Sequence, residues 1–73
     1  MKYNVGDIII ETCFKYESDW RTGYITDVTE HIVKGHVITI KWFDYEPEDA
    51  YTCVEIDRWI EMNNARHYPV GKQ

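Results

Sequence analysis

The alternation of apolar and polar residues over short stretches is the feature that most restricts what this chain can fold into. In the segment from His36 to Phe43, every second position is occupied by Ile38, Ile40 and Trp42, which therefore share one face of an extended strand. Two further stretches show the same alternation and contain many β-branched residues, namely Ile8–Tyr16 and Trp20–Val28. The sequence therefore predicts a protein built mainly of β-strands.

Residues that favour turns separate these stretches. Glu17-Ser18-Asp19 interrupts the alternation between the first two, and Lys34-Gly35 marks a turn before the third. The segment Asp44–Asp49, which includes a proline, predicts a loop that leads into a short strand at Ala50–Val54. Inside the second stretch, Gly23 stands where a close crossing of strands or a bulge would bend the chain.

After the fourth stretch the apolar spacing changes from that of a strand to that of a helix. The residues that follow this helical spacing are Ile56, Trp59 and Ile60. Glu55 and Asp57 would lie in the first turn, where carboxylates interact favourably with the helix dipole. We expect one short helical turn that ends near Asn63-Asn64, followed by an extended segment at Ala65–Val70.

Length and composition limit the chain to one small domain. The 73 residues allow a single unit over positions 1–73, and the 44% of hydrophobic and 15% of aromatic residues suffice for a core. No apolar run approaches the roughly 20 residues that cross a bilayer, so we expect no membrane segment and a cytoplasmic location. In that reducing compartment, Cys13 and Cys53 are expected to be free, buried thiols.

Charge is distributed unevenly along the chain. The segment Asp44–Glu61 holds seven of the thirteen acidic residues against one base, Arg58, which gives it a charge of −6. The remainder, with seven bases and six acids, sums to +1. Because binding to nucleic acid depends on neutralising phosphates with Lys and Arg, a negative chain without a basic cluster is a poor candidate for that function.

Four segments taken in order resemble the Tudor-like and KOW-like members of the SH3-like barrels over roughly residues 4–60. These segments are Val5-Gly6-Asp7-Ile8, Gly23-Tyr24-Ile25, the stretch from Val37 to Asp44, and Val54-Glu55-Ile56. The resemblance implies an all-β, small SH3-like barrel of about five strands with one short helical turn near the C-terminus. Residues 65–73 would then form its last strand or arm.

The C-terminal stretch WIEMNNARHYPV looks like the ends of small proteins encoded by tailed bacteriophages. This second resemblance implies that the chain works in the cytoplasm of an infected bacterium. A phage accessory protein that binds a host or viral protein is the function it suggests.

The acidic segment, interleaved with aromatic residues, is the main candidate for a site. Aromatic rings supply contact energy in protein interfaces, and carboxylates steer a partner with a basic surface. The predicted protein-binding residues are Asp44, Tyr45, Glu46, Glu48, Asp49, Tyr51 and Trp59. We therefore expect a non-enzymatic protein-binding module, and self-association along an exposed strand stays open.

A second candidate follows from the Tudor-like resemblance, which implies an aromatic cage for methylated lysine or arginine. The residues at the corresponding positions are Phe14, Tyr16, Trp20, Trp42 and Tyr45. The sequence departs from that pattern at Pro47, where such cages often carry an asparagine. The competing interpretation is that Phe14 and Trp42 belong to the core and that Trp20 and Tyr45 are scattered surface rings.

Other chemistry receives little support from the sequence. The residues able to ligate a metal are scattered without zinc-site spacing, namely Cys13, Cys53, His31, His36 and His67, so we expect no metal and no cofactor. No orienting group or phosphate-binding loop accompanies a Cys–His pair, so we expect no catalysis. A KOW-like contact with RNA through Arg66, His67, Tyr68 and Lys72 is the remaining alternative, although its few cations oppose a larger acidic field.

Overall fold

The structure is a computed structural model that describes residues 2–71. Within that range lie β1 (Ile8–Glu11), the 3₁₀ turn η1 (Glu17–Asp19), β2 (Arg21–His31), β3 (Gly35–Trp42), β4 (Asp49–Thr52), α1 (Cys53–Glu61) and β5 (Ala65–Tyr68). Of the expected C-terminal arm, positions 72 and 73, including Lys72, lie outside the described residues.

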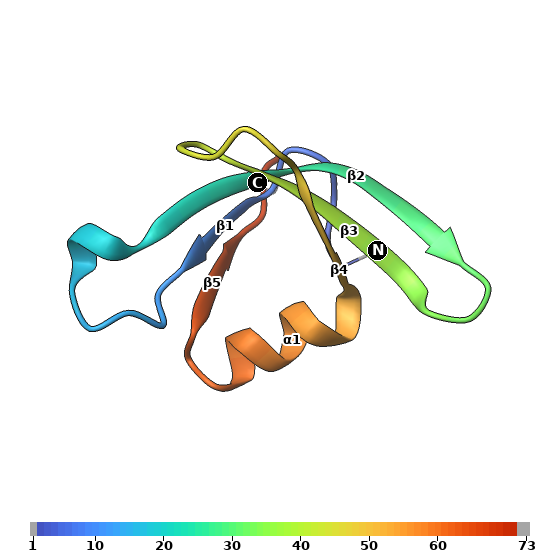
Figure 1. Cartoon of the computed structure of the whole chain (residues 1–73). Helices are drawn as coiled ribbons and strands as arrows, with labels where there is room; N and C mark the ends of the chain where they lie inside the picture. Colours follow the sequence, from blue (N-terminus) through green and yellow to red (C-terminus); the bar gives the residue numbers. More distant parts are fainter. Residues whose placement is uncertain (1, 72–73) are drawn as a thin grey trace.

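The strands form one antiparallel sheet in the order β4-β3-β2-β1-β5, so the last strand along the chain pairs with the first (Figure 1). The sheet is open, with β4 and β5 at its edges. The expected mainly-β architecture is therefore confirmed as a five-stranded antiparallel sheet with one helix.

Several boundaries differ from the sequence-based expectation. β2 continues to His31 beyond the expected end at Val28, and α1 ends at Glu61, before the expected Asn63-Asn64. The alternation predicted a first strand that continues to Tyr16, whereas β1 ends at Glu11, because its two neighbours also end there, with Arg21 and Ala65 opposite Glu11. The fourth strand was expected to reach Val54, which instead lies in the first turn of α1.

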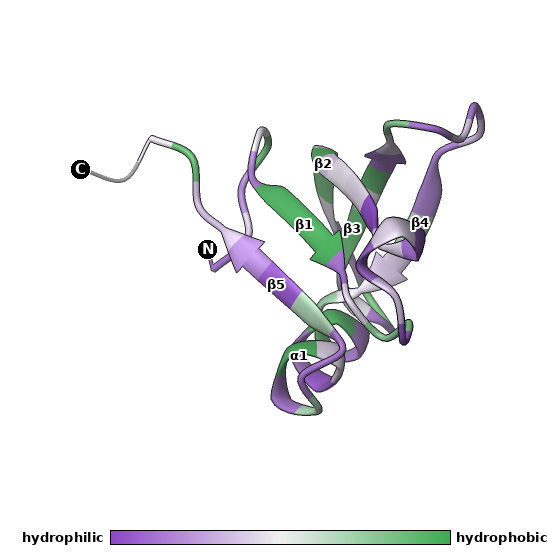
Figure 2. Cartoon of the chain, turned by 90° about the vertical axis from the view of Figure 1, so that its left-hand side faces the viewer, coloured by the Kyte–Doolittle hydropathy of each residue, from purple (hydrophilic) through white to green (hydrophobic). Residues whose placement is uncertain are grey.

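The core lies between the concave face of the sheet and α1, which runs beneath the arch of strands in Figure 1. Its buried residues are Tyr3, Ile9, Ile25, Ile38, Ile40, Trp42 and Ile56. The expected shared face of Ile38, Ile40 and Trp42 is confirmed and is buried in the core. Trp59 and Ile60 pack against the same core at helical spacing from Ile56. Figure 2 shows β1 as a strongly hydrophobic strand beside the more hydrophilic β5.

Gly23 allows β2 and β3 to approach closely. A Cβ at this position would lie 2.8 Å from a methyl group of Ile40, from the carbonyl oxygen of Lys41 and from the ring of Trp42. The expected close crossing at Gly23 is therefore confirmed, and the register of β2 on β3 shifts two residues later, between Ile25 and Asp27.

A capping box sets the start of α1. The hydroxyl oxygen of Thr52 accepts from the backbone N–H of Glu55 at 3.1 Å, and the Glu55 carboxylate accepts from the backbone N–H of Thr52 at 2.8 Å. These reciprocal bonds satisfy two amide groups that the first turn leaves unpaired. Over residues 2–71, no helix has the length and apolar character needed to cross a membrane.

Candidate binding surface

The connection between β3 and β4, residues 43–48, is here called the acidic loop. In Figure 1 it is the yellow turn at the upper left, which projects past the ends of β3 and β4. The side chains of Asp44, Tyr45, Glu46 and Glu48 are all exposed. Three carboxylates at alternate positions therefore create a local negative field around one exposed ring.

A lysine on β3 holds the backbone of the acidic loop. Lys41 Nζ donates to the carbonyl oxygen of Tyr45 at 2.9 Å and to that of Glu46 at 2.8 Å. The backbone N–H of Tyr45 also donates to the carbonyl oxygen of Trp42 at 3.4 Å. These contacts restrain the loop, so its carboxylates are presented on an ordered backbone.

The other three predicted contact residues face inward. The half-buried Asp49 carboxylate accepts from Trp42 Nε1 at 2.9 Å and from the Tyr51 hydroxyl at 3.3 Å. The rings of Tyr51 and Trp59 meet edge to face at a centroid distance of 4.6 Å and pack against the core. Burial, followed by the charge of Asp49, raises the pKa of Tyr51. The predicted set is thus divided between an exposed loop and residues that support it.

The five predicted cage residues do not form one cluster of rings. Among residues 2–71, no ring–ring contact joins two of them. Phe14 and Tyr16 are exposed, and Trp20 Nε1 donates to the carbonyl oxygen of Phe14 at 3.2 Å. Trp42 is only 1% exposed and belongs to the core, whereas Phe14, which the competing interpretation also assigned to the core, is outside it.

The protein's own cation covers the ring of Trp42. The guanidinium carbon of Arg21 lies 4.2 Å from the ring centroid, and Arg21 Nε donates to Glu11 at 2.8 Å. That hydrogen bond raises the pKa of Arg21. Beside this stack is a pocket of about 130 Å³. It is lined by Arg21, Thr22, Trp42, Asp44 and Tyr45, so the acidic loop forms one of its walls.

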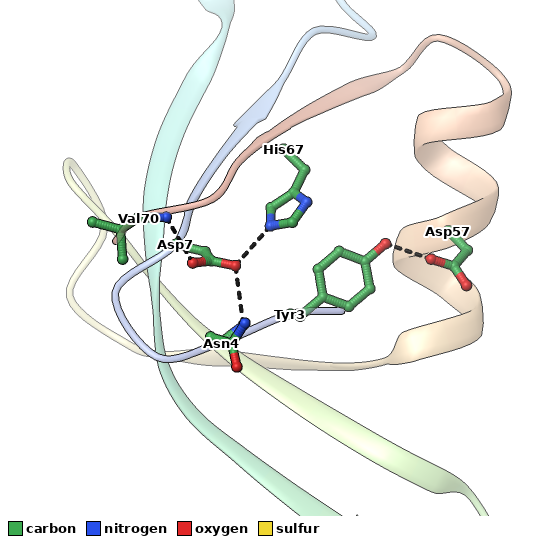
Figure 3. A network of polar contacts seen from close by, with 6 residues as sticks. All are labelled: Tyr3, Asn4, Asp7, Asp57, His67 and Val70. Carbon is green, nitrogen blue, oxygen red and sulfur yellow. Dashed lines mark hydrogen bonds and ion pairs between the residues drawn. The ribbon is translucent and has the colours of Figure 1, made fainter. Parts of the chain in front are cut away.

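A second polar cluster joins the two ends of the chain (Figure 3). Asp7 is fully buried, and its carboxylate accepts from the backbone N–H groups of Asn4 and Val70, each at 3.0 Å. His67 Nε2 lies 2.7 Å from the same carboxylate. Burial alone would raise the pKa of Asp7, but the bonds from Val70, His67 and Asn4 outweigh it and hold the pKa below its ordinary value.

A neighbouring pocket of about 280 Å³ lies between α1 and the N-terminal segment. The Tyr3 hydroxyl donates to Asp57 at one side of it, and Lys2 forms a 3.1 Å ion pair with the same carboxylate. The bond from Tyr3 lowers the pKa of Asp57, and burial followed by that bond raises the pKa of Tyr3. His67 lines this pocket as well, with its second ring nitrogen on the side that faces α1 (Figure 3).

The cysteines are both free, as expected, but Cys13 is exposed, so its predicted burial is wrong. It follows the end of β1, where the chain has left the sheet. Cys53 is half-buried with Sγ 4.0 Å from Asp57, and burial followed by that carboxylate raises the pKa of its thiol. In the part of the chain that the structure describes, no group of three or more His, Cys, Asp or Glu is arranged to hold a metal ion.

Sequence reasoning gave Asp7 no role beyond the resemblance and placed His67 among scattered residues, and so missed this network. The two residues are sixty positions apart in the chain, and only the pairing of β5 with β1 brings them together. An acid inside the otherwise apolar run of Val5 to Ile10 is the one local signal that pointed to it.

No family model, curated protein or solved structure matches this chain. Its class is therefore defined by its own architecture, a mostly-β domain with one helix, an exposed acidic loop and polar bonds that join the two chain ends.

Proposed function

We propose that this chain is a non-enzymatic protein-binding module that engages a basic surface of its partner through the acidic loop. The main support is that Asp44, Glu46 and Glu48 are exposed on a backbone that is held by hydrogen bonds from Lys41. A restrained loop loses less conformational entropy when it binds, so more of the contact energy appears as affinity. Exposed carboxylates also accelerate encounter with a positively charged partner.

The pocket beside the loop supports the same proposal. It offers the ring of Tyr45 and the carboxylate of Asp44 as walls for one side chain of the partner. A lysine or arginine fits this combination, because its aliphatic stem packs on the ring and its charge meets the carboxylate. The charge of Arg21, which also lines the pocket, is offset by its ion pair with Glu11. Tyr45 and Asp44 are therefore the proposed centre of the contact, and Glu46 and Glu48 its rim.

The strand order is also compatible with the SH3-like barrel that the sequence resembles, since the last strand returns to pair with the first. We extend the proposal to this fold relationship and to a phage accessory role, in which the partner is a host or viral protein in the bacterial cytoplasm. Both extensions rest on the resemblances described above.

The experiment compares two triple charge reversals in a tagged capture from bacterial lysate. One variant carries Asp44→Lys, Glu46→Lys and Glu48→Lys. Asp49 is left unchanged because it accepts bonds from Trp42 and Tyr51. The matched control carries Glu17→Lys, Asp27→Lys and Glu30→Lys at exposed positions elsewhere. Each substitution of an acid by lysine changes the charge by +2, so the net charge of both variants changes from −5 to +1.

We expect the loop variant to lose its specific partner and the control variant to keep it. The association rate with the purified partner should also fall as salt is raised, because screening weakens attraction between exposed charges. A partner set that is the same for the wild type and the loop variant would contradict the proposal. Loss of the partner in both variants would contradict it too, because the effect would then be one of net charge alone.

A further inference from the structure

The convex face of the sheet, which points away from α1, carries aromatic and aliphatic side chains where β5, β1, β2 and β3 lie side by side. Ile8 lies opposite Tyr68 of β5 on one side and opposite Tyr24 of β2 on the other. Tyr24 in turn lies opposite Lys41 of β3. These four residues form one row across the sheet, on the face opposite the buried Ile9.

A second row runs parallel to the first. Ile10 lies opposite Arg66 of β5 and opposite Thr22 of β2. Phe43 continues the pairing of β3 by one residue, since its N–H donates to the carbonyl oxygen of Thr22 at 2.9 Å. Its ring lies 5.9 Å from that of Tyr24, which belongs to the first row. The two rows together are here called the outer patch.

The outer patch is free of acidic residues. Its three rings and Arg66 are exposed, whereas Ile8, Ile10, Thr22 and Lys41 are half-buried. Its rings are open to solvent, with Tyr24 38%, Tyr68 46% and Phe43 61% exposed. None of the thirteen acids of this chain lies among its eight positions. The patch is thus the part of the sheet where two copies of a chain with net charge −5 meet the least repulsion.

The corners of the outer patch alternate between rings and cations. Tyr68 and Phe43 occupy one diagonal, and Arg66 and Lys41 occupy the other. Consider a two-fold axis that lies in the plane of the interface, parallel or perpendicular to the strands. Such an axis brings each aromatic corner of one copy opposite a cationic corner of the other copy. Two identical patches brought together by such an axis place Arg66 and Lys41 opposite aromatic residues of the other copy, an attractive arrangement. This adds to the contacts that each cation makes in its own chain, where Arg66 lies 5.2 Å from the Trp20 ring centroid and Lys41 donates to the carbonyl oxygens of Tyr45 and Glu46. No two cations are brought opposite each other.

From this pattern we infer that the chain forms a two-fold symmetric dimer through the outer patch. A sheet with apolar residues on both faces needs a layer on each. In residues 2–71, α1 covers the concave face, whereas the outer patch has no covering element of its own. A second copy supplies that layer with complementary corners, and Ile8, Ile10 and Tyr24 meet at its centre. The inference does not require the partner contact proposed for the acidic loop, although Phe43 begins that loop and Lys41 holds its backbone.

The test is the oligomeric state of the purified chain. Sedimentation equilibrium between roughly 10 and 500 µM will show a monomer–dimer equilibrium, because mass action shifts it over such a range. Tyr24→Thr, which keeps a residue suited to a strand, should raise the dimer dissociation constant about 10-fold or more. Phe43→Lys places like charges opposite each other and should weaken the dimer further.

The matched control is Tyr16→Thr, which removes an exposed tyrosine outside the patch and should leave the dimer unchanged. Circular dichroism confirms that each variant is folded. A wild-type chain that stays monomeric throughout, or a dimer that withstands both patch substitutions, would overturn the inference. So would a monomer that binds oligo(dT) in a Tyr24-dependent manner, because the patch would then be a surface for nucleic acid.

Discussion

At the scale of single residues, Asp7 is the most consequential side chain that the structure places. A buried carboxylate is tolerated only when hydrogen bonds replace its lost hydration, and here two amides and one imidazole do so. Its donors come from the N-terminal segment and from the residues around β5. One carboxylate thereby connects segments that are sixty or more positions apart.

We predict that Asp7→Asn destabilises the fold by about 2–4 kcal/mol at pH 7, because it leaves donors without a charged acceptor. The pKa of Asp7 is lower in the folded than in the unfolded chain, so its stabilisation is complete above the unfolded pKa of about 3.9 and is lost as pH falls through the folded pKa. Urea denaturation between about pH 2 and pH 7 measures this loss.

In the Asp7→Asn variant the acid-side dependence of stability should be weaker but still present, because the pKa of Asp57 is also lowered by Tyr3. The control is Asp44→Asn at an exposed position, which should change stability by no more than about 0.5 kcal/mol. An unchanged pH profile in the Asp7 variant would refute this role.

At the scale of elements, α1 begins where local chemistry directs it. β4 and α1 are contiguous in the chain, and Thr52 is the last residue of the strand and the N-cap of the helix. Its hydroxyl and the Glu55 carboxylate satisfy amides at the first turn, so the chain changes direction without a connecting loop. This arrangement sets where Ile56 enters the core.

Thr52→Ala removes the hydroxyl acceptor and is expected to cost about 1 kcal/mol, while Thr52→Ser should keep most of the stability because it retains the oxygen. Thermal denaturation of both variants beside the wild type measures the difference. Equal melting temperatures for the alanine and serine variants would show that the capping box does not hold α1 in place.

At the scale of the whole molecule, contacts between the first and last segments of the chain hold the fold together. Within residues 2–71, β5 is an edge strand that pairs with β1, and the residues around it supply two donors to Asp7. The inner side of β5 also contributes the buried Ala65. A single core of this size has little surplus stability, so the loss of one strand affects the whole domain.

We therefore predict that a chain ending at Asn64 does not fold cooperatively, whereas a chain ending at Gly71 does. The longer chain keeps β5 and the Val70 amide, and the shorter one leaves Asp7 with the Asn4 amide alone among these donors. Near-ultraviolet circular dichroism during heating distinguishes the two. A sharp transition in the shorter chain, close to that of the longer one, would show that β5 is dispensable.

Sequence reasoning located the elements because they depend on local patterns. The period of two in His36–Phe43 and the helical spacing of Ile56, Trp59 and Ile60 both appear at the expected places. The tight position of Gly23 was also visible, since only glycine permits such an approach. The ends of strands were predicted less accurately where pairing with a neighbouring strand sets them, as at the end of β1.

The candidate sites depended on information that a local pattern does not carry. The acidic run was visible, but Asp49, Tyr51 and Trp59 turned inward because β4 pairs with β3 and α1 packs beneath them. The five cage residues were selected by their positions along the predicted strands. Strand position alone does not show that Arg21 covers the ring of Trp42.

The sequence by itself determined which segments are strands, where the helix lies and how charge is distributed, because these follow from neighbouring residues. Only the tertiary structure decided that Asp7 is buried beside His67, and that Tyr68, Ile8, Tyr24 and Lys41 form one row. The physical reason is register: a shift of one residue moves every side chain of a strand to the other face, and register is set by contacts between distant segments.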